Sequence, residues 1–81
     1  MKVRAEISLY PLKTNKLSSP IDEFCRIIQA QGLEVQIGPM SSSVYGESKD
    51  LFETIQKAFE QLAKKYQVVM TVKISNACPL S

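Results

Sequence analysis

Alternating apolar and polar residues in short segments constrain the fold of this chain more than any other feature. The alternation runs through residues 3–10 and recurs over 33–37 and 68–75. A period of two predicts strands with one apolar face and one polar face. The segment 41–46 is a shorter and more polar candidate strand. We expect Pro11 to end the hydrogen-bond ladder of the first strand, because proline has no backbone N–H to donate.

The segments between these strands carry apolar residues at helical spacing. Each stripe follows an i, i+3, i+4, i+7 pattern, which predicts an amphipathic helix. The stripes consist of Ile21, Phe24, Cys25 and Ile28, and of Leu51, Ile55, Ala58, Phe59, Leu62 and Tyr66. We expect Ser19-Pro20 to open the first helix, Gly32 to end it, and Ser48 to cap the second.

The resulting order of elements is β-α-β-β-α-β, the ferredoxin-like pattern. The 81 residues leave room for one domain, spanning 1–81. We therefore expect an α+β fold, a four-stranded antiparallel sheet with two helices on one face. In this layout the first and third strands are central, and the fourth pairs with the first.

Composition excludes several classes of function. The formal charge is +2 and there is no apolar run of about 18 residues, so neither nucleic acid nor a membrane is expected as a partner. Histidine is absent and the two cysteines are too few for a cysteine-only zinc site, so no metal or resident cofactor is expected. The start of the chain lacks the pattern of a signal peptide, which predicts a cytoplasmic protein.

The sheet face without helices carries the polar residues of each strand. The first strand contributes Glu6 and Ser8, and the third contributes either Ser43 with Tyr45 or Ser42 with Val44, because the sequence does not fix the register. The remaining residues of this face are Tyr10, Glu34, Gln36, Thr71, Lys73 and Ser75. The small hydroxyls of this polar face suit a compact polar ligand or a partner sheet.

The candidate binding residues on this face and in the neighbouring loop each allow two interpretations. Glu6 either forms an exposed pair with Lys73 across the strands or accepts an amino group or cationic ring of a ligand. The three serines at 41–43 either bind a ligand or cap local turns. Tyrosines stack on a ligand ring or pack at a subunit contact, and Met40 walls a pocket or fills a gap. Cys25 lies on the apolar stripe and is interpreted as a core residue.

Five short motifs occur together in order along the chain. They are AEISLYPL at 5–12, GLEV at 32–35, GPMSS at 38–42, VYGE at 44–47 and SNACP at 75–79. In combination they resemble the YkoF-type thiamine-binding protein family, and the resemblance covers nearly the whole chain. The third-strand motif reads Ser-Ser-Ser, where relatives often show Ser-Thr.

The resemblance implies a ferredoxin-like subunit that binds thiamine or its hydroxymethylpyrimidine moiety and catalyses no reaction. It also implies assembly into dimers or tetramers through the sheets. Carried over by position, the implied ligand-binding residues are Glu6, Ser8, Met40, Ser42, Ser43, Tyr45 and Asn76.

Other functions compete with this one. An RNA-binding sheet needs aromatic residues on its central strands, which the segment Ser-Ser-Ser-Val-Tyr-Gly does not supply. An acylphosphatase-like enzyme needs an arginine in an N-terminal loop, whereas Arg4 and Arg26 fall within a strand and a helix. The remaining alternative is a purely structural oligomerisation module of ferredoxin-like fold with no small ligand.

Overall fold

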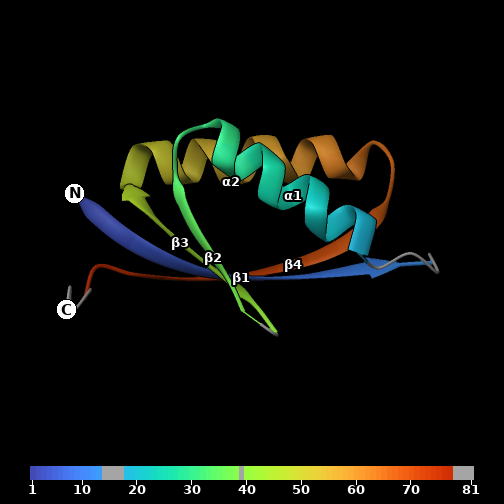
Figure 1. The fold of residues 1–81 in the computed structure, drawn as a ribbon, viewed down its shortest axis with the longest axis horizontal. Helices are drawn as coiled ribbons and strands as arrows, with labels where there is room; N and C mark the ends of the chain where they lie inside the picture. Colours follow the sequence, from blue (N-terminus) through green and yellow to red (C-terminus); the bar gives the residue numbers. More distant parts are fainter. Residues whose placement is uncertain (14–17, 39, 78–81) are drawn as a thin grey trace.

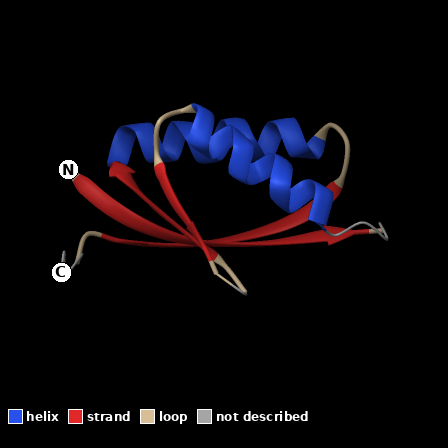
Figure 2. Cartoon of the chain, in the orientation of Figure 1, coloured by secondary structure: helices blue, strands red, loops and turns tan. Residues whose placement is uncertain are grey.

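The computed structural model describes residues 1–13, 18–38 and 40–77 and contains four strands and two helices (Figure 1). In chain order the elements are β1 (Lys2–Leu12), α1 (Ser18–Ala30), β2 (Glu34–Ile37), β3 (Ser42–Glu47), α2 (Ser48–Ala63) and β4 (Gln67–Ser75). Both helices lie on the same side of the sheet (Figure 2). This confirms the ferredoxin-like α+β fold predicted from the order of the periodic segments.

The strand order in the sheet is β2-β3-β1-β4, and all three pairings are antiparallel. β1 and β3 are therefore central, as predicted, and β4 pairs with β1. Glu6 of β1 lies between Ser43 of β3 and Lys73 of β4. This register places Ser43 and Tyr45 on the face away from the helices, because side chains alternate along a strand.

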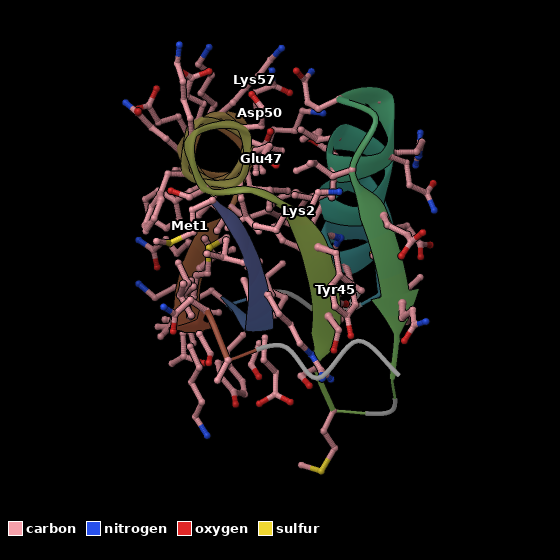
Figure 3. The ribbon with its side chains drawn as sticks, turned by 90° about the vertical axis from the view of Figure 1, so that its left-hand side faces the viewer. Met1, Lys2, Tyr45, Glu47, Asp50 and Lys57 are labelled. Carbon is pink, nitrogen blue, oxygen red and sulfur yellow. The ribbon has the colours of Figure 1, made fainter. Side chains whose placement is uncertain are left out.

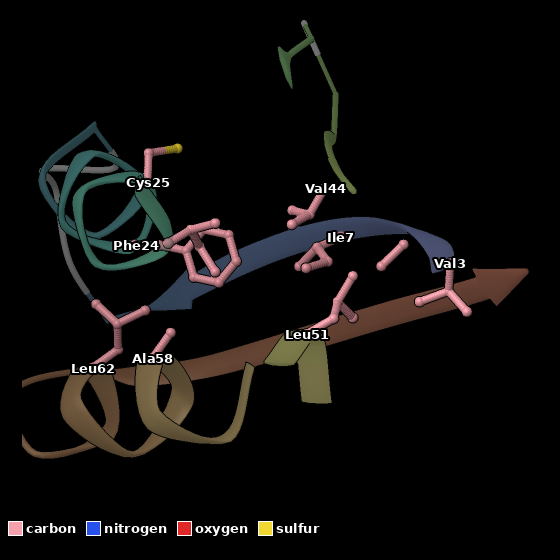
Figure 4. Close-up of a cluster of buried hydrophobic side chains, with 10 residues drawn as sticks. Val3, Ile7, Phe24, Cys25, Val44, Leu51, Ala58 and Leu62 are labelled. Carbon is pink, nitrogen blue, oxygen red and sulfur yellow. The ribbon is translucent and has the colours of Figure 1, made fainter. Parts of the chain in front are cut away.

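The core lies between the sheet and the two helices (Figure 4). Val3, Ala5 and Ile7 of β1 face the helices and are buried, because their alternation points every second side chain to one layer. Phe24 and Ile28 of α1 pack against them, in agreement with the predicted stripe. The other buried apolar members are Cys25, Val44, Leu51, Ala58 and Leu62.

The first strand continues through Pro11, contrary to our expectation. Pro11 lies opposite Val68, and Leu12 lies opposite Gln67 on β4. On its other side β1 is paired with β3 only as far as Ile7. Beyond that residue β1 is an edge strand, where the missing N–H of a proline removes no bond of the sheet.

The predicted helix starts were also wrong in detail. Helix α1 begins at Ser18, so Ser19 lies inside the helix. Helix α2 begins at Ser48, and its N-cap is Glu47 without a side-chain capping hydrogen bond. The backbone N–H of Ser48 instead donates to the carbonyl of Met1 at 2.8 Å. Tyr66, which we assigned to the second stripe, lies in the turn after α2 but still packs against the core.

Two other expectations about burial fail along one side of the molecule. Phe59, assigned to the apolar stripe, is 39% exposed. Val72 and Ile74 of β4 face the helical layer but are 38% and 37% exposed, although their partners Ile7 and Ala5 on β1 are buried. The two helices therefore leave the outer edge of β4 partly uncovered.

The two layers separate clearly in the end-on view of Figure 3. Asp50 and Lys57 lie on α2 in the helical layer, whereas Tyr45 lies on β3 in the sheet. At this end of the molecule the amino group of Met1 forms an ion pair with the Glu47 carboxylate at 2.9 Å. The hydrogen bond with this ammonium lowers the pKa of Glu47. Within the described ranges, no helix is long and apolar enough to cross a membrane.

Gly32 lies in the turn directly after α1 and has a left-handed backbone, as predicted, with a φ of 81°. Its N–H donates to the carbonyl of Gln29 at 3.0 Å. A Cβ at Gly32 would meet no heavy atom within 4 Å, so only the backbone conformation disfavours a side chain there.

We expect Gly32→Ala to lower the free energy of unfolding by about 1 kcal/mol, because alanine is disfavoured at positive φ. Urea unfolding followed by circular dichroism would measure this loss. The matched variant Gly32→Asn should lose much less, because asparagine tolerates this conformation. Equal stability of the wild type and Gly32→Ala would contradict the assignment.

Candidate functional site

The open face of the sheet, the one away from the helices, brings together four of the seven predicted ligand-binding residues. Glu6 and Ser8 come from β1, and Ser43 and Tyr45 come from β3. The register places all four side chains on the face away from the helices. Gln36 lies beside Ser43, and Glu34 lies beside Tyr45, on β2. The structure thus selects one of the two registers that the sequence left open.

Arg4 also lies on this face, although the sequence patterns did not single it out as a site residue. Its Nη2 atom donates to the Ser43 hydroxyl at 3.4 Å. The guanidinium carbon also lies 5.4 Å from the centroid of the Tyr45 ring, within the range of a cation–π contact. The alternation along β1 could have identified Arg4, because residues two apart in a strand share a face and Arg4 is two residues from Glu6. Arg4 therefore already engages two of the groups that we assigned to a ligand.

Glu6 remains available to a ligand in this arrangement. It lies opposite Lys73 across the β1–β4 pair, as predicted. Among the described residues, however, the ion pairs join Met1 to Glu47 and Lys65 to Glu23, and Glu6 takes part in neither. Its side chain is exposed. An exposed carboxylate without a close cationic partner can accept an amino group or attract a cationic ring.

A cavity of about 280 Å³ lies at the end of the sheet where β2 turns into β3. We call it the turn cavity. Apolar and aromatic side chains of β1 and α1 supply half of its ten lining residues, and the turn adds hydroxyl and backbone groups. Its lining residues are Ile7, Leu9, Tyr10, Ile21, Phe24, Ile37, Gly38, Met40, Ser41 and Ser42. Apolar walls with a few polar groups are typical of small-molecule sites, whose volumes start at about 300 Å³.

Two hydrogen bonds hold the turn at the mouth of this cavity. The Gly38 N–H donates to the carbonyl of Ser41 at 2.8 Å. A Cβ at Gly38 would lie 3.0 Å from the same Ser41 oxygen, so glycine permits this close approach. The Ser8 hydroxyl donates to the carbonyl of Met40 at 3.4 Å. Ser8 therefore links the open face to the turn cavity.

The remaining predicted residues fall into different places. Ser42 lies on the helix side of β3, is only 7% exposed and lines the turn cavity. Met40 also lines this cavity, although most of its side chain is in solvent. Asn76 is exposed and follows Ser75, which lies opposite Arg4 near the other end of β1. The structure thus does not bring Asn76 to the turn cavity.

Ser42 also contacts the thiol of Cys25 behind the cavity wall. Burial raises the pKa of the Cys25 thiol, and the side-chain hydrogen bond with Ser42 partly offsets this effect. The thiol of Cys25 is therefore protonated at neutral pH and is a poor nucleophile. The second cysteine, Cys78, lies outside the described residues.

The comparisons with known proteins agree with this fold. A family model of thiamine-binding proteins matches residues 5–77, and the chain belongs to this family. No curated protein matches the chain. The match to the family model covers all five motifs except the last two residues of SNACP.

Three solved structures share the fold. A protein of Streptococcus pneumoniae has a TM-score of 0.89 at 24% identity, over 100% of this chain and 92% of its own. A candidate thiamine biosynthesis/salvage protein of Thermotoga maritima has a TM-score of 0.84 at 22% identity, over 93% of this chain and 83% of its own. A domain of unknown function from Bacillus cereus has a TM-score of 0.79 at 23% identity, over 93% of this chain and 75% of its own.

We predict that Cys25 reacts slowly with thiol reagents in the folded protein, at least about tenfold more slowly than in urea. Peptide-resolved mass spectrometry after alkylation at pH 8 would measure its rate separately from that of Cys78. Equal rates in the native and unfolded chain would contradict the burial of Cys25.

The raised pKa of Cys25 also predicts how stability depends on pH. The folded state holds the proton more tightly than the unfolded state, in which the pKa is about 8.5. This contribution to stability is complete below that value and is lost as pH rises through the folded pKa. The alkaline decline in stability should be smaller in Cys25→Ala, which removes the titrating group.

Proposed function

We propose that this protein binds thiamine or its hydroxymethylpyrimidine moiety and carries out no chemistry on it. The observation that carries the proposal is the turn cavity, which lies beside Ser8 and Ser42 in a chain of the thiamine-binding family. The structural likeness to the Thermotoga maritima protein, described in terms of thiamine biosynthesis or salvage, adds support.

The chemistry of the ligand matches the two parts of the site. The aminopyrimidine ring is flat and needs apolar contacts together with a few hydrogen-bond partners, which the walls of the turn cavity and Ser41 and Ser42 supply. The thiazolium ring carries a permanent positive charge. Because Arg4 covers the Tyr45 ring, we assign the cation to the exposed carboxylate of Glu6 and not to Tyr45.

The absence of catalysis is part of the proposal. The sequence contains no histidine, and the Cys25 thiol is buried with a raised pKa. Arg4 is held by Ser43 and Tyr45 and lies within a strand. Thiamine incubated with the protein should accordingly be recovered unchanged when analysed by mass spectrometry.

We further propose that copies of the chain associate through their sheets as dimers or tetramers. The open face carries exposed apolar side chains at one end, on Tyr10, Leu12 and Val69. Oppositely charged residues lie on the rest of the face, including Arg4 and Glu6. A purely structural oligomerisation module with no small ligand is the second candidate, and these exposed apolar groups favour it.

Isothermal titration with thiamine and with hydroxymethylpyrimidine tests the binding function. We expect both compounds to bind, and Ser41→Trp to weaken both by at least about tenfold, because the indole would fill the turn cavity. Glu6→Gln should weaken thiamine more than the neutral pyrimidine, because it removes the carboxylate assigned to the cation.

The control variant is Glu60→Gln, which removes one exposed carboxylate of α2 and should leave both affinities unchanged. If neither compound gives heat or a thermal shift at millimolar concentration, the proposal is wrong and the structural module is favoured. An equal loss of both ligands in Glu6→Gln would reject the role assigned to Glu6.

A further inference from the structure

A second hollow lies in the helical layer, between α2 and the turn after α1, and we call it the interhelix hollow. Its volume is about 280 Å³. In contrast to the turn cavity, all of its lining residues are polar. They are Gln31, Asp50, Glu53, Thr54 and Lys57. In Figure 3, Asp50 and Lys57 lie on the outer side of the helical layer, away from the sheet. The interhelix hollow is therefore separate from both the turn cavity and the open face.

The lining residues from α2 form one row along the helix. Their spacing is i, i+3, i+4, i+7, which places them on one helical face. Asp50 and Lys57 are about 10 Å apart along the helix axis, because each helical residue rises about 1.5 Å. Thr54 is only 4% exposed and forms the floor, whereas the charged side chains are exposed. In chain order the row thus presents an acid at Asp50, an acid at Glu53 and a base at Lys57.

The charged groups of the interhelix hollow do not pair with one another. Glu53 and Lys57 are four residues apart, a spacing at which opposite charges on a helix can pair. The polar pair Gln56–Glu60 has the same spacing on α2 and is formed, since the Gln56 amide donates to the Glu60 carboxylate at 3.1 Å. Among the described residues, however, neither of the two ion pairs includes a residue of this hollow. Its carboxylates and its ammonium group are therefore available to a ligand.

The charge balance of the lining favours a ligand with a net positive charge. The two acids Asp50 and Glu53 against the one base Lys57 give a formal charge of −1. The C-terminal end of α1 precedes Gln31 directly and adds partial negative charge. A simple amine would leave Lys57 unmatched, and a neutral zwitterion would leave one carboxylate unmatched. Two cationic groups and one carboxylate in the same molecule match all three side chains.

We propose that the interhelix hollow binds a basic α-amino acid of the lysine or arginine type. The ligand carboxylate pairs with Lys57, the α-ammonium group with Glu53, and the cation of the ligand side chain with Asp50. The order of charges along the ligand is then the order along the row. The Gln31 amide completes the site from the α1 side, because it can donate to the carboxylate or accept from the ammonium group.

This second site does not depend on the proposed binding of thiamine. The interhelix hollow and the turn cavity share no lining residue. The helices also lie on the side of the sheet opposite to the open face, so association through the sheets would leave the hollow accessible (Figure 2). A failure of either proposal therefore leaves the other one standing.

Isothermal titration of the full chain with three matched compounds tests the class of ligand. They are L-lysine, L-norleucine, which lacks the side-chain ammonium group, and 1,5-diaminopentane, which lacks the carboxylate. We expect L-lysine to bind in the millimolar range or more tightly. Each of the other two should bind about fivefold more weakly, because each loses one exposed charge pair.

Two substitutions assign the charges to their partners. Asp50→Asn should abolish the preference for L-lysine over L-norleucine, and Lys57→Gln should abolish the preference for L-lysine over 1,5-diaminopentane. Glu60→Gln and Lys64→Gln are the matched controls, because they remove exposed charges of the same sign outside the hollow. Both controls should keep the two preferences, and circular dichroism would verify that all four variants are folded.

The absence of heat with both L-lysine and L-arginine at millimolar concentration overturns the proposal. So does equal affinity for the three matched compounds, which indicates unspecific attraction of charge. Binding of L-lysine that Ser41→Trp abolishes and Asp50→Asn does not change would place the amino acid in the turn cavity and also overturn it.

Discussion

The antiparallel pairing of β1 with both β3 and β4 is the constraint on which the rest of the structure depends. It places Ala5 between Val44 and Ile74, and Glu6 between Ser43 and Lys73. A shift by one residue would move Ala5 and Ile7 out of the core and place Glu6 beneath the helices, at a high cost in free energy. The burial of one face of β1 therefore fixes which side chains the other face presents.

The same pairing creates the turn cavity. β3 begins at Ser42, which lies opposite Ile7, so it does not extend alongside the rest of β1. β1 continues to Leu12 alongside β4. The unpaired side of β1 beyond Ile7 leaves space that α1 and the β2–β3 turn enclose only in part. A mismatch in strand length thus produces a hollow with apolar walls beside a polar face. It also explains why Pro11 is tolerated within β1.

Much of this arrangement could be predicted from the sequence. Period-two alternation in β1 and β4 and the two apolar stripes were sufficient for the fold, because each pattern has only one way to bury its apolar side. The register of β3 could not be predicted, since its serines suit either face. Arg4 was missed because its importance comes from contacts with Ser43 and Tyr45, which are about 40 residues away in the chain. The exposure of Phe59 depends on how far α2 lies from the β4 edge, which periodicity does not specify.

The central claim is that the turn cavity, and not the open face alone, holds the ligand. A titration of the ¹⁵N-labelled protein with thiamine, followed by NMR, tests this most directly. The largest changes in amide chemical shift should occur at Leu9, Ser41 and Ser42, which line the cavity. Changes confined to Glu34, Gln36 and Tyr45 on the open face would contradict the account.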